Sequence, residues 1–118
     1  MKKTPRKPET EKKYKKYLAD KYDGACIFCQ RKQLIKEFKY WTLHKNEFPY
    51  DGMGLPLKSH LMLAPKRHLK FEMEITNEEI IDLHEIELEL DFDMRIFNSK
   101  SRQSIPTHLH YHYIKFDN

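Results

Sequence analysis

The feature that most constrains the fold lies near the C-terminus, where three histidines alternate with apolar or aromatic residues over residues 107–114 (THLHYHYI). The alternation has the two-residue period of a β-strand, whose successive side chains point to opposite faces of a sheet. His108, His110 and His112 therefore share one predicted face, and the leucine and tyrosines between them share the other. That second face suits a hydrophobic core, whereas imidazoles about 6.6 Å apart along the first face need an explanation beyond packing.

Three interpretations of the histidine row are open. A surface tract or purification tag would not interleave apolar residues in strict alternation. A catalytic zinc ion bound by all three is disfavoured, because the outer pair stand about 13 Å apart along a strand while Zn–N bonds are about 2.0–2.1 Å. The third interpretation divides the work, so that one histidine is structural, one reacts and one assists.

The length and the charge distribution bound the organisation of the chain. A chain of 118 residues allows one small domain with one core. It has no apolar run of membrane-spanning length and no signal-peptide pattern, so we expect a cytoplasmic protein without membrane contact. Residues 1–21 hold nine Lys/Arg against three Asp/Glu, a net charge of +6, whereas the whole chain carries +4. We therefore divide the chain into a basic, partly disordered N-terminal arm (residues 1–21) and a domain (residues 22–118).

The arm itself has two interpretations. Residues 11–21 (EKKYKKYLADK) predict a short helix with Tyr14, Tyr17 and Leu18 on one side. This segment is either a solvated tail with a weak docking stripe, or a mobile basic arm that attracts phosphate-rich ligands such as nucleic acid.

Two cysteines form a C-x-x-C motif, Cys26–Cys29 (CIFC). In a chain expected in the cytoplasm, this motif is more typical of half a metal site or of a redox pair than of a disulfide. The preceding residues 22–25 (YDGA) predict a turn rather than the strand that a thioredoxin-like motif requires.

The remaining elements predict an α+β fold built on an antiparallel sheet, with one main helix and a short N-terminal helix. Thr76 and Glu79 form a capping box, after which a helix runs to about Leu90. Residues 46–56 form a loop that holds two of the three glycines. We expect strands at residues 34–38, 40–45, 60–65, 93–98 and 107–114.

Three segments resemble the histidine-triad (HIT) family. Residues 108–114 resemble its signature His-φ-His-φ-His-φ-φ, residues 59–68 (SHLMLAPKRH) resemble its strand-and-turn segment, and Cys26–Cys29 resembles the C-I-F-C that opens many zinc-containing members. They occur in the family's order and span roughly residues 25–114. The resemblance implies a HIT-like fold and nucleotidyl transfer or hydrolysis at an α-phosphate.

By position, the resemblance implies that His110 is the catalytic nucleophile, which forms a covalent nucleotidyl-histidine. That role needs a neutral imidazole whose other N–H is held by a backbone carbonyl. His112 would help bind the phosphate or the leaving group, and His60 would face the same site. Polar substrate contacts would come from the loop before the triad, namely from Asn98, Gln103 and Ser104.

The resemblance also implies a structural zinc site. Its ligands would be two thiolates and two imidazoles, a closed tetrahedral set: Cys26, Cys29, His68 and His108. Such a metal would tie the N-terminal turn to the central sheet and so stabilise a small domain. The plainer interpretation is two thiols and two ordinary histidines.

Two departures from the family pattern leave the exact activity open. Residues 103–108 (QSIPTH) hold one residue more than the usual pre-triad segment and no glycine, so the leaving-group contact is open. Residues 46–49 (NEFP) are similar to the family's transferase branch, but that branch has Gln where this chain has His112, which favours the hydrolase-like branches. We therefore predict a nucleotide phosphohydrolase or nucleotidyl transferase, and a homodimer by resemblance. The rival hypothesis is a non-catalytic nucleotide- or nucleic-acid-binding module that uses the basic arm.

Overall fold

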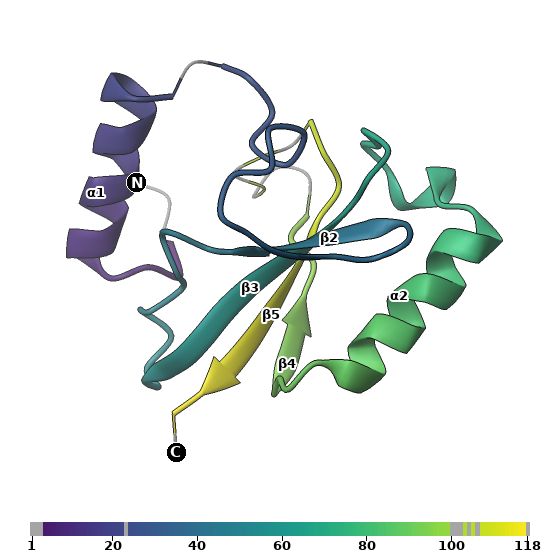
Figure 1. The fold of residues 1–118 in the computed structure, drawn as a ribbon. Coiled ribbons are helices and arrows are strands. Elements are labelled where there is room, and N and C mark those ends of the chain that lie inside the picture. The colour runs from purple at the N-terminus through teal and green to yellow at the C-terminus, as the bar shows by residue number, and fades with distance from the viewer. Residues whose placement is uncertain (1–3, 23, 100–102, 104, 106, 118) are drawn as a thin grey trace.

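A computed structural model describes residues 4–22, 24–99, 103, 105 and 107–117. The architecture is α+β, as predicted: one five-stranded antiparallel sheet, with α1 and α2 on either side of it (Figure 1). The strands are β1 (Leu34–Glu37), β2 (Trp41–Lys45), β3 (Leu57–Pro65), β4 (Met94–Ile96) and β5 (Tyr111–Phe116). The helices are α1 (Pro8–Asp20), α2 (Asn77–Glu89) and the short 3-10 helix η1 (Glu72–Glu74).

The sheet has the order β1-β2-β3-β5-β4, so β3 and β5 lie near its middle although many residues separate them in the sequence. Their register pairs His60 with Ile114, Met62 with His112, and Leu63 with Tyr111. Because directly opposite residues of an antiparallel pair share a face, this register decides which side chains of β3 meet the triad.

The two faces of the sheet carry different cores, as the alternation in residues 107–114 predicts. On the α2 face, Tyr111 and Tyr113 pack with Trp41 and with Leu83 and Ile86 of the helix. On the opposite face, a second cluster forms around buried aromatic and apolar side chains: Phe28, Met62 and Ala64. The triad histidines lie on this second face, and the rings of His108 and His110 both contact Phe28.

The histidine strand begins later than predicted. β5 starts at Tyr111, so His108 and His110 lie in the irregular segment before it. The cause is a change of partner: the Leu109 N–H donates to the carbonyl of Leu69, which lies beyond the end of β3. The three histidines therefore do not lie on one continuous strand. His108 lies beside Pro65, at the end of β3.

Other boundaries also differ from the prediction. β3 begins at Leu57, three residues earlier than expected, because its N-terminal part pairs with the end of β5 at Phe116. β4 occupies only three residues of the predicted 93–98, since its pairing with β5 ends at Ile96.

The N-terminal helix is longer than predicted. It begins at Pro8 rather than at residue 11, and proline at the first helical position is favourable because its missing N–H would have no partner there. In the described part of the arm, residues 4–21, α1 and the residues before it contact the loop at residues 46–52. The division into arm and domain stays a prediction. Within the described residues, no helix has the length and apolarity to span a membrane.

The capping box at the start of α2 is confirmed. The hydroxyl of Thr76 accepts a hydrogen bond from the Glu79 N–H at 3.2 Å, and the Glu79 carboxylate accepts one from the Thr76 N–H at 2.9 Å. The same carboxylate pairs with the Arg67 guanidinium at 2.7 Å, so the cap also connects α2 to the turn after β3.

Replacing Thr76 with alanine removes the acceptor for the Glu79 N–H. We expect Thr76→Ala to lower the free energy of unfolding by about 1 kcal/mol, whereas Thr76→Ser keeps the cap and most of the stability. Urea denaturation followed by circular dichroism measures both variants. Equal stability of the alanine and wild-type proteins would contradict the role of the cap.

Candidate functional site

Two histidines from different strands meet on the face opposite α2. His60 of β3 and His112 of β5 are diagonal neighbours, since His112 pairs directly with Met62. The Nε2 atom of His60 lies 2.8 Å from Nδ1 of His112. Tyr50 closes the group: its backbone N–H donates to Nδ1 of His60 at 3.1 Å, and its hydroxyl oxygen lies 3.3 Å from Nε2 of His112.

One backbone donor determines which nitrogens of His60 and His112 carry protons. Because the Tyr50 N–H can only donate, Nδ1 of His60 is an acceptor, and neutral His60 carries its proton on Nε2. That proton is donated to Nδ1 of His112, whose own proton then lies on Nε2 and faces the Tyr50 oxygen. The Asn98 amide donates to the same oxygen at 2.8 Å. Asn46 Nδ2 lies 3.2 Å from Nε2 of His60, which in this state is a contact between two donors.

Burial keeps this network neutral. It lowers the pKa of His60 to about 3, and the nearby charges of Arg6 and His110 act in the same direction. Burial also lowers the pKa of His112 well below the usual value and raises the pKa of the Tyr50 phenol. At neutral pH the group therefore offers directed N–H dipoles without a net charge.

His110 is held by its own backbone. Its Nδ1 lies 2.9 Å from the carbonyl oxygen of His108, and because a carbonyl only accepts, Nδ1 carries the proton. The lone pair of the neutral ring is then on Nε2. The ring is 3 % exposed and packs between Phe28 and His112, with centroid distances of 5.1 and 4.9 Å. A ring whose Nδ1–H is held by a backbone carbonyl is the tautomer that the resemblance to the histidine-triad family implies for a nucleophile.

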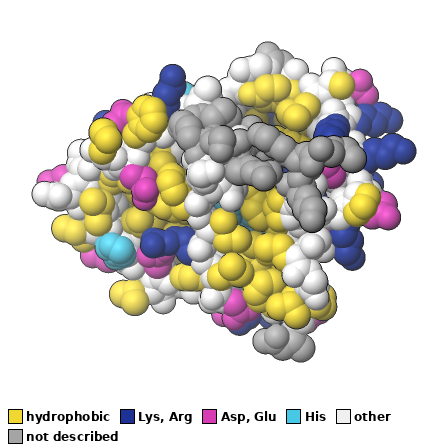
Figure 2. All heavy atoms as spheres, turned by 180° about the vertical axis from the view of Figure 1, so that it is seen from behind, with side chains coloured by type: hydrophobic (Ala, Val, Ile, Leu, Met, Phe, Trp, Pro, Cys, Tyr) yellow, Lys and Arg dark blue, Asp and Glu magenta, His cyan; other side chains and the backbone are white. Residues whose placement is uncertain are grey.

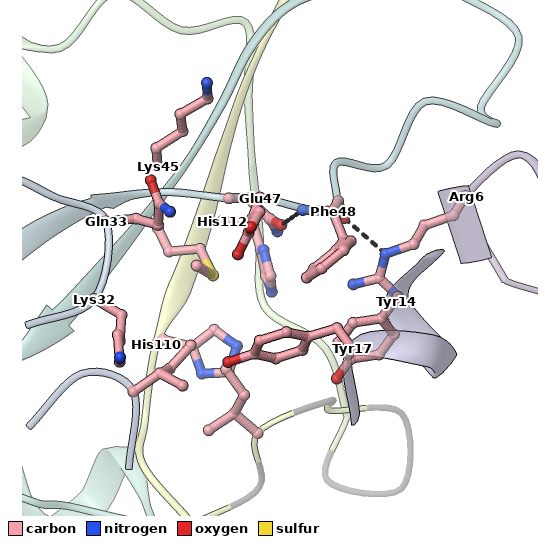
Figure 3. A pocket seen from close by; sticks show the side chains of 14 residues that line it. Arg6, Tyr14, Tyr17, Lys32, Gln33, Lys45, Glu47, Phe48, His110 and His112 are labelled. Atoms are coloured by element: carbon pink, nitrogen blue, oxygen red, sulfur yellow. Dashed lines mark hydrogen bonds between the residues drawn. The ribbon is translucent and has the colours of Figure 1, made fainter. Parts of the chain in front are cut away.

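A pocket lies beside His110 and His112 (Figure 3). Its empty space is about 550 Å³, a volume that includes open solvent at the mouth. Its charged lining residues are three cationic side chains (Arg6, Lys32 and Lys45) and one acidic side chain, Glu47. Its apolar and aromatic lining comes from Tyr14, Tyr17, Ile27, Phe48, Met62 and Ile105. Arg6 is paired with Glu11 at 3.4 Å, so the positive balance rests on the two lysines, and it favours an anionic ligand.

The predicted substrate-binding residues are placed differently. Asn98 donates to the Tyr50 hydroxyl, and Gln103 donates to the Asn98 carbonyl at 2.9 Å. Neither of them is among the residues that line the pocket. Ser104 lies outside the described residues. His60 likewise contacts His112 and does not line this pocket.

The four predicted metal ligands come together. One donor atom from each of Cys26, Cys29, His68 and His108 lies within 4.8 Å of the others. Nδ1 of His108 is 3.2 Å from the Cys26 sulfur, 3.7 Å from the Cys29 sulfur and 3.1 Å from Nδ1 of His68. Ordinary Zn–N and Zn–S bond lengths place tetrahedral ligand atoms about 3.3 to 3.8 Å apart, so the cluster has the size of a metal site.

The tautomer of His108 also suits metal binding. Its Nε2–H donates to the carbonyl of Pro65 at 2.8 Å, which leaves the Nδ1 lone pair facing the sulfurs. Metal-bound histidines commonly donate their second N–H to a carbonyl in this way. Burial lowers the pKa of His108, which keeps the ring in the neutral form that a ligand needs.

Two histidines, His44 and His84, belong neither to the triad network nor to the cysteine cluster. Five of the seven histidines are buried, and little histidine surface is visible on the face in Figure 2. His44 is a structural residue, whose ring nitrogens bond the Lys32 carbonyl and the Thr42 hydroxyl. The exposed ring of His84 pairs with Glu87 on α2, away from the site.

Sequence analysis did not assign Tyr50 or Arg6 to the site, although both lie near the triad. Tyr50 follows the N-E-F-P segment directly, so its place beside a family-like motif was a signal that could have identified it. Arg6 carries no comparable signal, because one basic residue in a basic tail looks like its neighbours. Its guanidinium nevertheless lies within 5.1 Å of the Tyr50 ring centre.

Comparison with known proteins identifies the fold. No protein-family model and no curated protein sequence matches the chain. A histidine triad protein from Clostridium difficile is 22% identical, with a TM-score of 0.54, covering 82% of this chain and 94% of that one. A HIT family hydrolase from Clostridium thermocellum is 21% identical, with a TM-score of 0.57 and the same coverage. A HIT family hydrolase from Legionella pneumophila is 20% identical, with a TM-score of 0.53, covering 77% of this chain and 91% of that one.

These similarities show that the chain has the histidine-triad fold, as the three sequence segments predicted. Identities near a fifth of the aligned residues define the fold and leave the reaction to be argued from the site.

The buried network gives His60 a distinctive titration. Its pKa is lower in the folded chain than in the unfolded chain, so the unfolded state binds the proton first and stability falls as the pH drops from about 6.5 towards 3. We expect the His60 ring signals in an NMR titration to stay unchanged between pH 8 and pH 5. A titration midpoint near 6.5 would show that the ring is solvated rather than held in the network.

Proposed function

We propose that this protein is a nucleotide phosphohydrolase or nucleotidyl transferase that acts at an α-phosphate through His110. The observation that carries the proposal is the placement of His110, whose Nδ1–H is held by the His108 carbonyl and whose ring lines a pocket with three cationic side chains. The two solved structures named as HIT family hydrolases support this class of reaction.

The reaction has two displacements at phosphorus. In the first, the Nε2 lone pair of His110 forms a bond to the phosphorus, and the bond to the leaving group breaks with its electron pair going to that group. In the second, water or another acceptor attacks the phosphorus and loses a proton, and the P–N bond breaks to return the pair to Nε2. The imidazole is cationic while the nucleotide is attached, and its Nδ1–H bond to the His108 carbonyl stabilises that charge.

The neighbouring histidines suit a cationic intermediate because they are neutral. Burial holds the pKa of both His60 and His112 low, so neither ring adds a repelling positive charge beside His110. The network through Tyr50 fixes the orientation of His112, which lines the pocket next to the reacting ring. Lys32 and Lys45 would attract the phosphate and oppose its negative charge.

We further propose that the Cys2His2 cluster binds a structural zinc ion. The ligand spacing and the His108 tautomer fit tetrahedral zinc, and a closed set of four protein ligands suits a structural rather than a catalytic ion. The metal would join the turn before β1 to the segments that follow β3 and precede β5. Its contribution would be to the stability of the fold, since none of the four ligands lines the pocket beside His110.

Removal of the metal should therefore destabilise the domain. We expect about one zinc per chain in protein purified without added metal, and a melting temperature lower by roughly 10 °C or more after chelation. Cys26→Ser should lose the metal, whereas the surface variant His84→Gln should keep it. Elemental analysis and thermal denaturation measure both effects, and zinc far below one per chain in gently handled protein would count against the site.

Substitution of the nucleophile tests the reaction directly. We expect His110→Asn to lower turnover of adenosine 5′-phosphoramidate or of dinucleoside polyphosphates by about 10⁴-fold or more, because no other group provides the P–N bond. His84→Asn is the matched control on the surface. Quenching wild-type protein with alkali during turnover of a labelled substrate should trap label on the chain, since phosphoramidate bonds survive alkali.

Turnover that survives His110→Asn would remove this residue as the nucleophile. Nucleotide binding without turnover of any substrate would favour the non-catalytic module over the enzyme. A homodimer, nucleic-acid binding and a cytoplasmic location stay predictions.

A further inference from the structure

The N-terminal segment forms part of the pocket that contains His110. Three lining residues, Arg6, Tyr14 and Tyr17, come from this segment, and Figure 3 shows them on the side opposite Lys32 and Lys45. The sequence left two interpretations of this segment open, a solvated tail with a weak docking stripe or a mobile basic arm that attracts phosphate-rich ligands. Its position beside the reactive ring gives it a different role.

The loop at residues 46–52 holds this segment in place by specific contacts. Lys7, the N-cap residue of α1, provides no side-chain cap, and Asp51 provides one instead by accepting from the Lys7 N–H at 2.7 Å and from the Thr10 hydroxyl. The Gly52 N–H donates to the Pro5 carbonyl at 2.7 Å. A Cβ atom at Gly52 would lie 2.7 Å from the Arg6 carbonyl carbon, so the two backbones approach too closely for a side chain.

Aromatic rings connect the helix to the pocket. Tyr14 and Tyr17 are half-buried residues of α1, and their ring centres are 5.2 and 5.3 Å from that of Phe48. Arg6 donates from Nε to the Phe48 carbonyl at 2.7 Å, and its guanidinium lies 4.4 Å from the Tyr14 ring centre. All four side chains line the pocket, which therefore has a wall of aromatic rings with one cation among them.

The lysines of α1 do not take part in this wall. Lys12, Lys13, Lys15 and Lys16 are exposed, and none of them lines the pocket. The helix therefore contributes aromatic surface to the site and keeps most of its charge in solvent.

We propose that α1 is a substrate-binding element, in which Tyr14 and Tyr17, together with Phe48, stack on the planar base of the nucleotide. This inference rests on the proposed function, because it takes a nucleotide as the ligand of the pocket. An aromatic ring gains binding free energy by stacking on any base, so such a wall would favour a nucleotide over a sugar phosphate. Arg6 next to the rings would favour the same anionic ligand.

The test compares two ligands that differ only by the base. Adenosine 5′-monophosphate carries the planar ring, and ribose 5-phosphate lacks it. We expect the full-length variant Tyr14→Leu/Tyr17→Leu to bind adenosine 5′-monophosphate about ten- to hundredfold more weakly and to bind ribose 5-phosphate as the wild type does. Isothermal titration calorimetry measures both, and circular dichroism checks that each variant is folded.

Two matched variants separate stacking from other causes. Tyr14→Phe/Tyr17→Phe keeps both rings and should retain the affinity for adenosine 5′-monophosphate. Lys13→Gln/Lys16→Gln removes charge from the exposed side of α1 and should leave both affinities unchanged at physiological ionic strength.

Four results would overturn the inference. Equal loss of affinity for both ligands in the leucine variant would mean that α1 supports the pocket without contacting the base. Unchanged binding, or no binding of adenosine 5′-monophosphate by the wild type, would remove the stacking site. A loss in the lysine variant as large as in the leucine variant would assign the effect to charge. The His110→Asn turnover test is independent of all four, so either idea can fail alone.

Discussion

The pairing of β3 with β5 is the constraint on which the rest of the site depends. Its register brings His60 beside His112, and the points where the two strands part place His68 and His108 beside the cysteine turn. A slip of one residue would turn His112 towards α2, and Tyr111 and Tyr113 towards the pocket. The large aromatic side chains packed under α2 oppose that slip, because they fit only in the apolar core. The hydrophobic face thus holds the polar face in position.

Fixed proton positions follow from this arrangement. Backbone groups that can only donate or only accept set the tautomers of His60, His108 and His110, and His112 takes its tautomer from His60. Side-chain hydrogen bonds to backbone groups are less mobile than those between two side chains, so the site is ordered before a ligand arrives. His108 and His110, two residues apart, therefore differ in tautomer. The proton of His108 is on Nε2 and that of His110 is on Nδ1.

Most of the fold and part of the site could be predicted from the sequence, because they depend on local patterns. The alternation around His110 predicted the two faces of the sheet, and Thr76 with Glu79 predicted the start of α2. A helix in the arm was predicted, but its position could not be, since its first turn is held by Asp51, more than forty residues away. The start of β5 at Tyr111 depends on the bond between Leu109 and Leu69, and the place of Asn98 depends on Tyr50. Such long-range partners leave no periodic trace in the chain.

The tight contact between Gly52 and Pro5 has a practical consequence for work with the protein. A fusion partner joined ahead of Thr4 would emerge beside the loop that carries Phe48 and Tyr50, where bulk can reach the mouth of the pocket. β5 ends at Phe116, which pairs with Leu57 at the end of β3 farthest from Pro65. An affinity handle at the C-terminus would therefore begin near Pro56, whose carbonyl accepts from the Asp117 N–H, rather than at the contact between Arg6 and Phe48.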